Sequence, residues 1–231
     1  EDLSRLKLKW AFAYPEGASG PVQVAGGRVF LASGDGQVHS PDARTGCSYW
    51  SFDSGRTVRA VTIAAIGPDN AAGGRIGVFF GDDQSAVTAL DATSGALLWR
   101  TPVETHPLAR ITAPPVVYEG RVYAPVSGME DPLTHDPGYA CCTHRGSVAA
   151  LDAASGKLLW KSYTVQEEPK PLPKASAEAV QHFAPAGGSV YTPLGIDTRR
   201  KLVYAATAEA YRRENPAGAY SVIAFDMETG A

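Results

Sequence analysis

Short apolar runs, separated by turn-forming residues, follow one another along the whole chain. Examples are residues 28–32, 58–65, 76–81, 121–126 and 202–207, and no long stretch shows the 3.6-residue periodicity of a helix. Runs of this length bounded by Gly, Pro, Asn or Asp are typical of β-strands. Turn formers are abundant, with 24 glycines and 17 prolines among 231 residues. The pattern predicts an all-β protein built from many short strands.

A short motif closes each group of strands. It starts with an Asp, continues through small residues to a Gly, and ends on a Trp after a short apolar step. Copies lie at 42–50, 91–99 and 152–160, and a fourth begins at Asp226 and runs to Gly230. An Asp side chain can accept backbone N–H groups within a turn, and Gly permits a positive φ. The motif therefore predicts a hairpin whose Trp either covers the sheet edge or packs between neighbouring sheets.

Two further strands precede each copy, so the chain repeats a unit of four antiparallel strands. Such repeats are typical of a β-propeller, in which each four-stranded sheet is one blade. We predict one partial propeller domain with about four blades. Their approximate bounds are 13–53, 54–104, 105–165 and 184–231, and residues 1–12 are predicted to be a strand that completes another blade.

The two ends of the chain leave two hypotheses open. In one, the N-terminal strand pairs with the last blade and closes a four-bladed ring. In the other, which we favour, the chain is part of a larger propeller. Structure is expected directly from Glu1, with no visible signal peptide, which suggests a mature or cut form.

The charge and the apolar runs of the chain limit the kinds of partner that it can bind. The net charge is -3 and no basic cluster is present, which argues against a nucleic-acid partner. No apolar run approaches the roughly 18 residues of a membrane span.

Cys47 stands alone, whereas Cys141 and Cys142 are adjacent. These two either form a disulfide, which would imply an oxidising compartment, or remain two half-buried thiols.

The repeats, such as the one from Leu151 to Trp160, resemble those of the quinoprotein alcohol dehydrogenases, eight-bladed propellers that carry pyrroloquinoline quinone (PQQ). The start, from Leu6 to Phe12, is similar to the start of their propeller domain. Residues 140–152, 163–171 and 185–204 resemble the polyvinyl alcohol dehydrogenase branch. The resemblance covers nearly the whole chain and implies about half of such a domain. It also implies a periplasmic or secreted enzyme that oxidises an alcohol, polymeric or secondary, and passes electrons to a cytochrome c.

The family's cofactor is PQQ with Ca²⁺, or with a lanthanide in some members. The quinone's carboxylates require Arg and hydroxyl donors, its flat rings require an aromatic face, and the hard cation requires oxygen ligands. These requirements define which residues of the chain are candidates for binding PQQ and the metal ion.

The resemblance places four PQQ-binding side chains. Arg59 falls on the second inner strand, beside apolar residues that would leave it in need of an anion. Thr112 falls on the next inner strand, Ser127 after the strand that follows, and Tyr191 where the family has a stacking Trp. Arg145 starts a strand and is predicted to reach the channel. Each has an ordinary alternative: an ion pair for either arginine, a strand-end hydroxyl for Thr112 or Ser127, and a core aromatic for Tyr191.

Two carboxylates are candidate metal ligands. Glu130, in the segment 127–130, matches the family's metal-binding Glu, and Glu209 falls where the family has Asn or Asp. Both follow the second strand of a blade, so we predict that they face one centre. The alternative for Glu130, which precedes Asp131, is a solvated loop.

Several departures from the family pattern leave other interpretations open. Ala208 replaces a Gly before the metal ligand, and a Glu expected near residues 19–21 is absent. The family's catalytic Asp comes from a later blade, so no general base is predicted here, and no Cys-x-x-Cys-His haem motif occurs. The alternative functions are a non-catalytic propeller acting as a binding or assembly scaffold, and a degenerate piece without activity.

Overall fold

The computed structural model describes residues 6–14, 16–17, 20–67, 74–173, 180–211 and 216–231. A 3₁₀ helix, η2, spans Asp131–His135. The strands are β1 (Gln23–Ala25), β2 (Arg28–Ala32), β3 (Gln37–Pro41), β4 (Ser48–Asp53), β5 (Val58–Ala65), β6 (Ile76–Asp82), β7 (Ala86–Asp91), β8 (Leu97–Pro102), β9 (Ala109–Arg110), β10 (Val116–Tyr118), β11 (Arg121–Gly128), β12 (Ser147–Asp152), β13 (Leu158–Tyr163), β14 (Lys170–Pro171), β15 (Phe183–Ala184), β16 (Gly195–Asp197), β17 (Leu202–Ala206) and β18 (Val222–Asp226).

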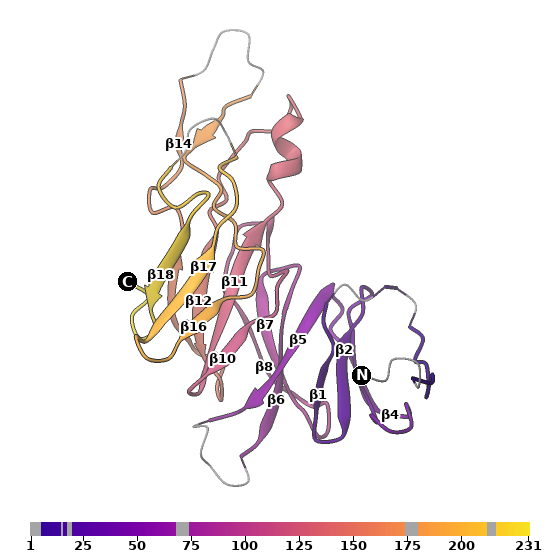
Figure 1. The fold of residues 1–231 in the computed structure, drawn as a ribbon. Coiled ribbons are helices and arrows are strands. Elements are labelled where there is room, and N and C mark those ends of the chain that lie inside the picture. The colour runs from indigo at the N-terminus through magenta and orange to yellow at the C-terminus, as the bar shows by residue number, and fades with distance from the viewer. Residues whose placement is uncertain (1–5, 15, 18–19, 68–73, 174–179, 212–215) are drawn as a thin grey trace.

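Consecutive strands pair into antiparallel sheets that stand side by side (Figure 1). The first sheet is β1–β4 and the second is β5–β8. The third is β10–β13, with β9 also paired to β11, and the last contains β16–β18. Each sheet is a blade of a β-propeller, so the prediction of an all-β propeller with four-stranded antiparallel blades is confirmed. No helix in the described ranges is long and apolar enough to span a membrane.

The hydrophobic core lies between neighbouring blades. Phe30 of the first sheet packs with Val61, Val78 and Phe80 of the second. A second cluster joins Phe79 to Val122 and Leu151 across the next interface, and a third joins the third and last sheets. The second and third sheets bury both faces in this way, which explains why strands such as β6, β7 and β12 are apolar almost throughout rather than alternating.

The motif tryptophans pack between blades rather than over sheet edges. Each indole N–H donates to the carbonyl of the residue after the motif Asp in the following copy. The bonds join Trp10 to Ala43, Trp50 to Ala92, Trp99 to Ala153 and Trp160 to Met227, with N···O distances of 3.0–3.1 Å. The motif Gly lies directly beneath this ring. A Cβ on Gly156, for example, would lie 2.5 Å from Trp99, and φ there is +70°.

The motif Asp organises its turn as predicted. Asp91 Oδ1 accepts the backbone N–H of Thr93 (3.0 Å) and of Ser94 (2.9 Å), and its other oxygen pairs with Arg75 at 2.9 Å. These donors, with the Arg75 hydrogen bond contributing most, lower the pKa of Asp91 to about 2. The equivalent carboxyls of Asp42, Asp152 and Asp226 also have lowered pKa values. The largest cause is the hydroxyl of Tyr49 in β4 for Asp42, and hydrogen bonds from Ser155 and Thr229 within the turn for Asp152 and Asp226.

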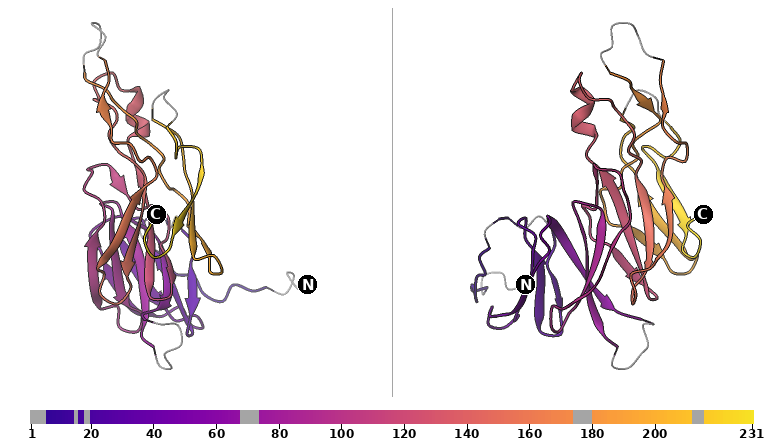
Figure 2. Two further views of the ribbon diagram at one scale, coloured as in Figure 1. Left: turned by 90° about the vertical axis from the view of Figure 1, so that its left-hand side faces the viewer. Right: turned by 180° about the vertical axis from the view of Figure 1, so that it is seen from behind.

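The row of sheets is open. Figures 1 and 2 show the first and last sheets at opposite ends, so the described residues do not form the closed four-bladed ring. The predicted strand 1–12 lies partly outside the described residues, and its described part, residues 6–12, contains no strand. Even so, Trp10 bonds to the motif turn of the first sheet in the same way as each motif Trp bonds to the motif turn of the following sheet.

Two inner strands differ from the sequence prediction. The inner strand of the third sheet is split into β9 and β10, with Thr112 in the gap, because Pro114 and Pro115 have no N–H to donate. In the last sheet β16 begins at Gly195, so Tyr191 lies before it rather than on a strand. Backbone N–H groups here pair elsewhere, and that of Val190 donates to Val126 of β11.

Candidate functional site

The starts of two neighbouring inner strands enclose a small hollow of about 10 Å³. It is lined by Thr57, Arg59, Asp83, Arg110, Ile111 and Thr112. Arg59 lies in β5 where the pairing with β6 shifts register between Val58 and Val61. Such a bulge redirects a side chain, and Arg59 is exposed although both of its chain neighbours are buried. The structure therefore brings Arg59 and Thr112 together.

The third blade is held against the second at this hollow. Ile111 packs over Gly81, where a Cβ would come within 2.1 Å of the Ile111 side chain. The backbone N–H of Ile111 also donates to the Asp82 carbonyl at 3.0 Å. The residues on either side of Ile111, Arg110 and Thr112, are fixed by these contacts beside Arg59.

Ser127 joins the same group from the end of β11. Its hydroxyl donates to the backbone carbonyl of Arg110 (3.1 Å) and lies 3.1 Å from the hydroxyl of Thr112. Ser127 is fully buried. Because the Ser127 hydroxyl donates its proton to the Arg110 carbonyl, its oxygen must accept the proton of the Thr112 hydroxyl. The oxygen of Thr112 is then free to accept a hydrogen bond from another donor.

Tyr191 continues this group toward the last blade. Its hydroxyl donates to the carbonyl of Gly128, the residue after Ser127, at 2.9 Å. Its side chain is 37% exposed, and burial of the hydroxyl raises its pKa. Arg59, Thr112, Ser127 and Tyr191 thus lie at the same ends of three successive blades.

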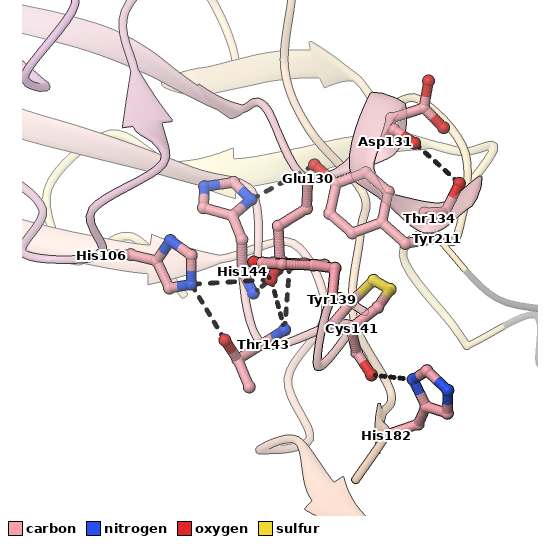
Figure 3. The surroundings of a disulfide bond; sticks show 11 residues. His106, Glu130, Asp131, Thr134, Tyr139, Cys141, Thr143, His144, His182 and Tyr211 are labelled. Atoms are coloured by element: carbon pink, nitrogen blue, oxygen red, sulfur yellow. Dashed lines mark hydrogen bonds and ion pairs between the residues drawn. A yellow bond between two sulfur atoms is a disulfide. The ribbon is translucent and has the colours of Figure 1, made fainter. Parts of the chain in front are cut away.

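Glu130 lies elsewhere and is completely buried (Figure 3). Its carboxylate accepts the hydroxyl of Tyr139 at 2.8 Å and the backbone N–H groups of Thr143 and His144 at 2.7–3.0 Å. The Nε2 atom of His106 is 3.9 Å away. The negative charge of Glu130 raises the pKa of Tyr139, after the larger effect of burial.

These contacts do not fit a metal ion at Glu130. Both carboxylate oxygens already face donor hydrogens, and a cation at the same place would face those hydrogens too. Glu209 is half-buried, and after burial its charge contributes to the raised pKa of Tyr191. Within the described ranges, no group of three or more His, Cys, Asp or Glu side chains is placed to hold a metal.

Arg145 does not join the hollow. Its guanidinium stacks 3.9 Å above the ring centre of Tyr163 and donates to the carbonyls of Val165 and Gln166. It lines a separate pocket of about 300 Å³, together with His106, Thr143 and His144. Burial, and secondarily His106, lower the pKa of His144 to about 4, so this imidazole is neutral near pH 7. We had expected Arg145 to reach the channel, and the aromatic face of Tyr163 holds it here instead.

The adjacent cysteines belong to the loop 139–144, whose donors bind Glu130. A disulfide joins Cys141 and Cys142, which are buried with Tyr139, Ala186 and Tyr211. Figure 3 shows this pair beside Tyr139, one of the donors to Glu130. Cys47 is free and exposed. The disulfide therefore lies within the loop 139–144, which supplies all three donors to Glu130.

The four motif copies and the interlocked blades define a propeller of the PQQ-repeat class. The family model PQQ_2, described as outer membrane protein assembly factor BamB, matches residues 4–130, and the chain belongs to this family. The fold also superimposes on quinohemoprotein alcohol dehydrogenase ADHIIG from Pseudomonas putida HK5. The TM-score is 0.71, with 21% identity, over 97% of this chain and 34% of that one.

Curated relatives match along nearly the whole chain. A polyvinylalcohol dehydrogenase of Pseudomonas sp is 38% identical over 229 residues, which are 99% of this chain and 36% of the relative. A second, from Sphingopyxis sp. (strain 113P3), is 37% identical over 230 residues, 100% of this chain and 35% of the relative. The predicted resemblance to this branch is confirmed. The chain spans about a third of the length of these relatives.

The hollow fits the carboxylate-bearing part of a quinone such as PQQ. The buried Nε of Arg110 and the buried Oδ1 of Asp83 have no hydrogen-bond partner in the structure. Neither Arg59 nor Arg110 forms an ion pair with an acidic residue in the described part of the chain. Two guanidinium groups that form no ion pair and outnumber the one carboxylate of the hollow are suited to an anionic ligand.

Arg110 and Asp83 were missed by the sequence reasoning. Alternation along a strand places residues 110 and 112 on the same side, so the prediction for Thr112 could have drawn attention to Arg110. No comparable pattern marks Asp83, which lies in the turn between β6 and β7.

Proposed function

We propose that the chain is part of a PQQ-dependent dehydrogenase that oxidises an alcohol. One observation carries this proposal: Arg59 shares a hollow with Thr112, whose hydroxyl lies within hydrogen-bonding distance of Ser127, at the start of neighbouring inner strands. A guanidinium without a carboxylate partner beside two hydroxyls is the arrangement that a quinone carboxylate requires. The relatives that match along the chain are polyvinylalcohol dehydrogenases.

Each residue has a distinct task in this proposal. Arg59 binds and orients a carboxylate of PQQ, and Thr112 adds a hydroxyl whose direction Ser127 sets. The half-exposed ring of Tyr191 offers a face against the ring system, and its bond to Gly128 fixes the plane of that face. When bound, the quinone supplies the two-electron oxidation of the alcohol. The buried walls of the second and third blades exclude water from the side of the hollow that they form.

The substrate, acceptor and compartment follow from the same proposal. The names of the relatives favour a polymeric or secondary alcohol. We propose that electrons pass to a cytochrome c, since the reduced cofactor must be reoxidised. The disulfide between Cys141 and Cys142 supports a periplasmic or secreted location, because such bonds persist in oxidising compartments.

A scaffold without catalytic activity is the second candidate. It is favoured by the description of the matching family, an assembly factor. That match ends at residue 130, however, whereas the dehydrogenase relatives continue through the third and last blades. The two candidates differ in whether the protein binds PQQ.

The test is PQQ binding by the full-length protein that contains this chain, purified without cofactor. Quenching of tryptophan fluorescence and the quinone absorbance report binding, and reduction of a dye by added alcohols reports turnover. We expect saturable binding, weakened about tenfold or more in Arg59→Gln, because a charged hydrogen bond to a carboxylate is lost.

Arg75→Gln is the matched control. Arg75 is an exposed arginine in an ion pair with Asp91 at the turn before β6, outside the hollow. We expect PQQ affinity to be unchanged in this variant. Absence of saturable PQQ binding in the wild-type protein would favour the scaffold, and equal weakening in both variants would show that Arg59 acts only through stability.

A further inference from the structure

The hollow beside Arg59 contains a second guanidinium that the resemblance does not account for. Arg110 comes from β9 of the third blade, whereas Arg59 comes from β5 of the second. Asp83 supplies the hollow's one carboxyl side chain. With two guanidinium groups and one carboxylate, the lining retains one net positive charge.

The backbone of Arg110 is held firmly. Its carbonyl accepts the hydroxyl of the buried Ser127, and Arg110 pairs with Ser127 in the β9–β11 ladder. The next residue, Ile111, is packed on Gly81 and bonded to Asp82. The side chain therefore starts from a fixed point, which lowers the entropy that a ligand must overcome to engage it.

Asp82, whose backbone carbonyl accepts the N–H of Ile111, is not available to neutralise Arg110. Asp82 is committed to Arg100 at 2.6 Å and to the backbone N–H groups of Gln84 and Ala86. Asp83 lines the hollow, but its buried Oδ1 has no partner, and neither has the buried Nε of Arg110. Buried polar atoms are rarely left unpaired, so a partner from outside this part of the chain is indicated.

The size of the hollow limits what can enter. About 10 Å³ holds a group of roughly the size of one water. A carboxylate oxygen fits this space, whereas a ring system must lie outside it, over the strand ends near Tyr191. We propose that Arg110 is a second guanidinium that binds one carboxylate of the quinone together with Arg59, and that Asp83 restricts the hollow to a single carboxylate. This inference rests on the proposed function.

The test compares two ligands on the full-length protein prepared without cofactor: PQQ, and its trimethyl ester, which lacks the negative charges. We expect Arg110→Gln to weaken PQQ binding roughly 10- to 100-fold, as expected for lost charged hydrogen bonds. Binding of the ester should be the same in Arg110→Gln and in the wild-type protein. Arg75→Gln, outside the hollow, should bind both ligands as the wild-type protein does.

Two further variants keep the test decisive if Arg110→Gln does not fold. Arg110→Lys retains the charge but not the planar fork, and its affinity for PQQ should lie below that of the wild-type protein. Asp83→Asn removes a charge that repels the ligand and should tighten PQQ binding about threefold or more, without changing binding of the ester.

The outcomes separate the inference from the proposed function. If the wild-type protein does not bind PQQ, the proposed function is wrong and the inference falls with it. If it binds PQQ and the Arg110 and Asp83 variants bind equally well, only the inference is wrong. Equal weakening of PQQ and of the ester would also overturn it, because that result would indicate a structural role for Arg110.

Discussion

Glu130 shows how a single residue can match a family pattern and yet have other partners. The segment 127–130 matches the family's metal ligand in sequence, and in the structure its carboxylate is enclosed by the donors of the loop 139–144. A buried carboxylate with several donors is costly to disturb, because the donors are left unpaired in turn. Here Glu130 connects the end of β11 to the loop that carries the disulfide.

Glu130→Gln should therefore destabilise the fold. A Gln side chain would turn an NH₂ group toward the N–H groups of Thr143 and His144, or leave one of them without an acceptor. We expect the free energy of unfolding to fall by roughly 2–4 kcal/mol, measured by urea denaturation.

Glu119→Gln is the control for this prediction. Glu119 is an exposed acid in an ion pair with Lys201, and its removal should change the free energy of unfolding very little. A structural Glu130 also predicts that Ca²⁺ leaves the unfolding midpoint of the isolated chain unchanged. A Ca²⁺-dependent rise of the midpoint that Glu130→Gln abolishes would show that Glu130 binds the metal after all.

The family resemblance, rather than periodicity, drew attention to Arg59, Thr112 and Ser127, and their role in binding stays a prediction. Thr112 and Ser127 lie together because both lie where paired strands end. Arg145 and Glu130 were not predictable in this way. Their partners, Tyr163 and the backbone at 143–144, depend on the path of the long loop between β11 and β12, which no periodicity specifies.

At the scale of elements, the contact between a motif Trp and the Gly of the next copy sets the spacing of the blades. Trp99 lies on Gly156, which takes a φ of +70° and leaves no space for a Cβ. Gly55 has a similar φ of +63°, but nothing lies within 4 Å of its missing Cβ. A comparison of Gly156 with Gly55 therefore separates the effect of the positive φ from the effect of packing against Trp.

Gly55→Ala should cost about 1–2 kcal/mol of stability, the penalty of the left-handed conformation. Gly156→Ala should cost this amount and roughly 1–3 kcal/mol more, because the Trp99 ring must move and strain the interface between the blades. Urea denaturation of both variants measures the difference. If both variants lose the same free energy of unfolding, the Trp99 ring moves aside without destabilising the interface between the blades.

The motif Asp predicts how the fold responds to acid. The pKa of Asp91 is lowered to about 2, so its contribution to stability is fully present above the ordinary pKa of about 4. That contribution is lost as the pH falls through about 2. Between these values the free energy of unfolding of the wild-type chain should decrease more steeply than that of Asp91→Asn.

Denaturation midpoints recorded from pH 2 to 5 measure this slope. Asp131→Asn, at an exposed site outside the motif copies, serves as the control and should retain the wild-type slope. The prediction is wrong if Asp91→Asn and the wild-type chain lose stability in parallel over this range.

At the scale of the whole molecule, the repeats were enough to predict the propeller, because every copy carries its own Asp and Gly, and the Trp of each of the first three copies docks on the next copy. The inner strands were less predictable. Prolines split the inner strand of the third blade, and that of the last blade starts later than its apolar run indicates. An open row of sheets also leaves apolar residues uncovered at its ends.

These ends should make the isolated chain associate with itself. Val222 of β18, the outermost strand of the last sheet in the described ranges, is 74% exposed, and Val24 at the opposite end is 67% exposed. An uncovered edge strand with apolar side chains offers both unpaired backbone groups and a surface for another copy. Sedimentation velocity of the 231-residue chain should show concentration-dependent oligomers.

Val222→Lys should shift the chain toward monomer, because a charged side chain on an edge strand opposes pairing with a second edge. Ile76→Lys is the matched control. Ile76 is also an exposed apolar residue, but it begins β6 in the second sheet, which has a sheet on either side. We expect this control to associate as the wild-type chain does. A wild-type chain that stays monomeric at high concentration would contradict the prediction.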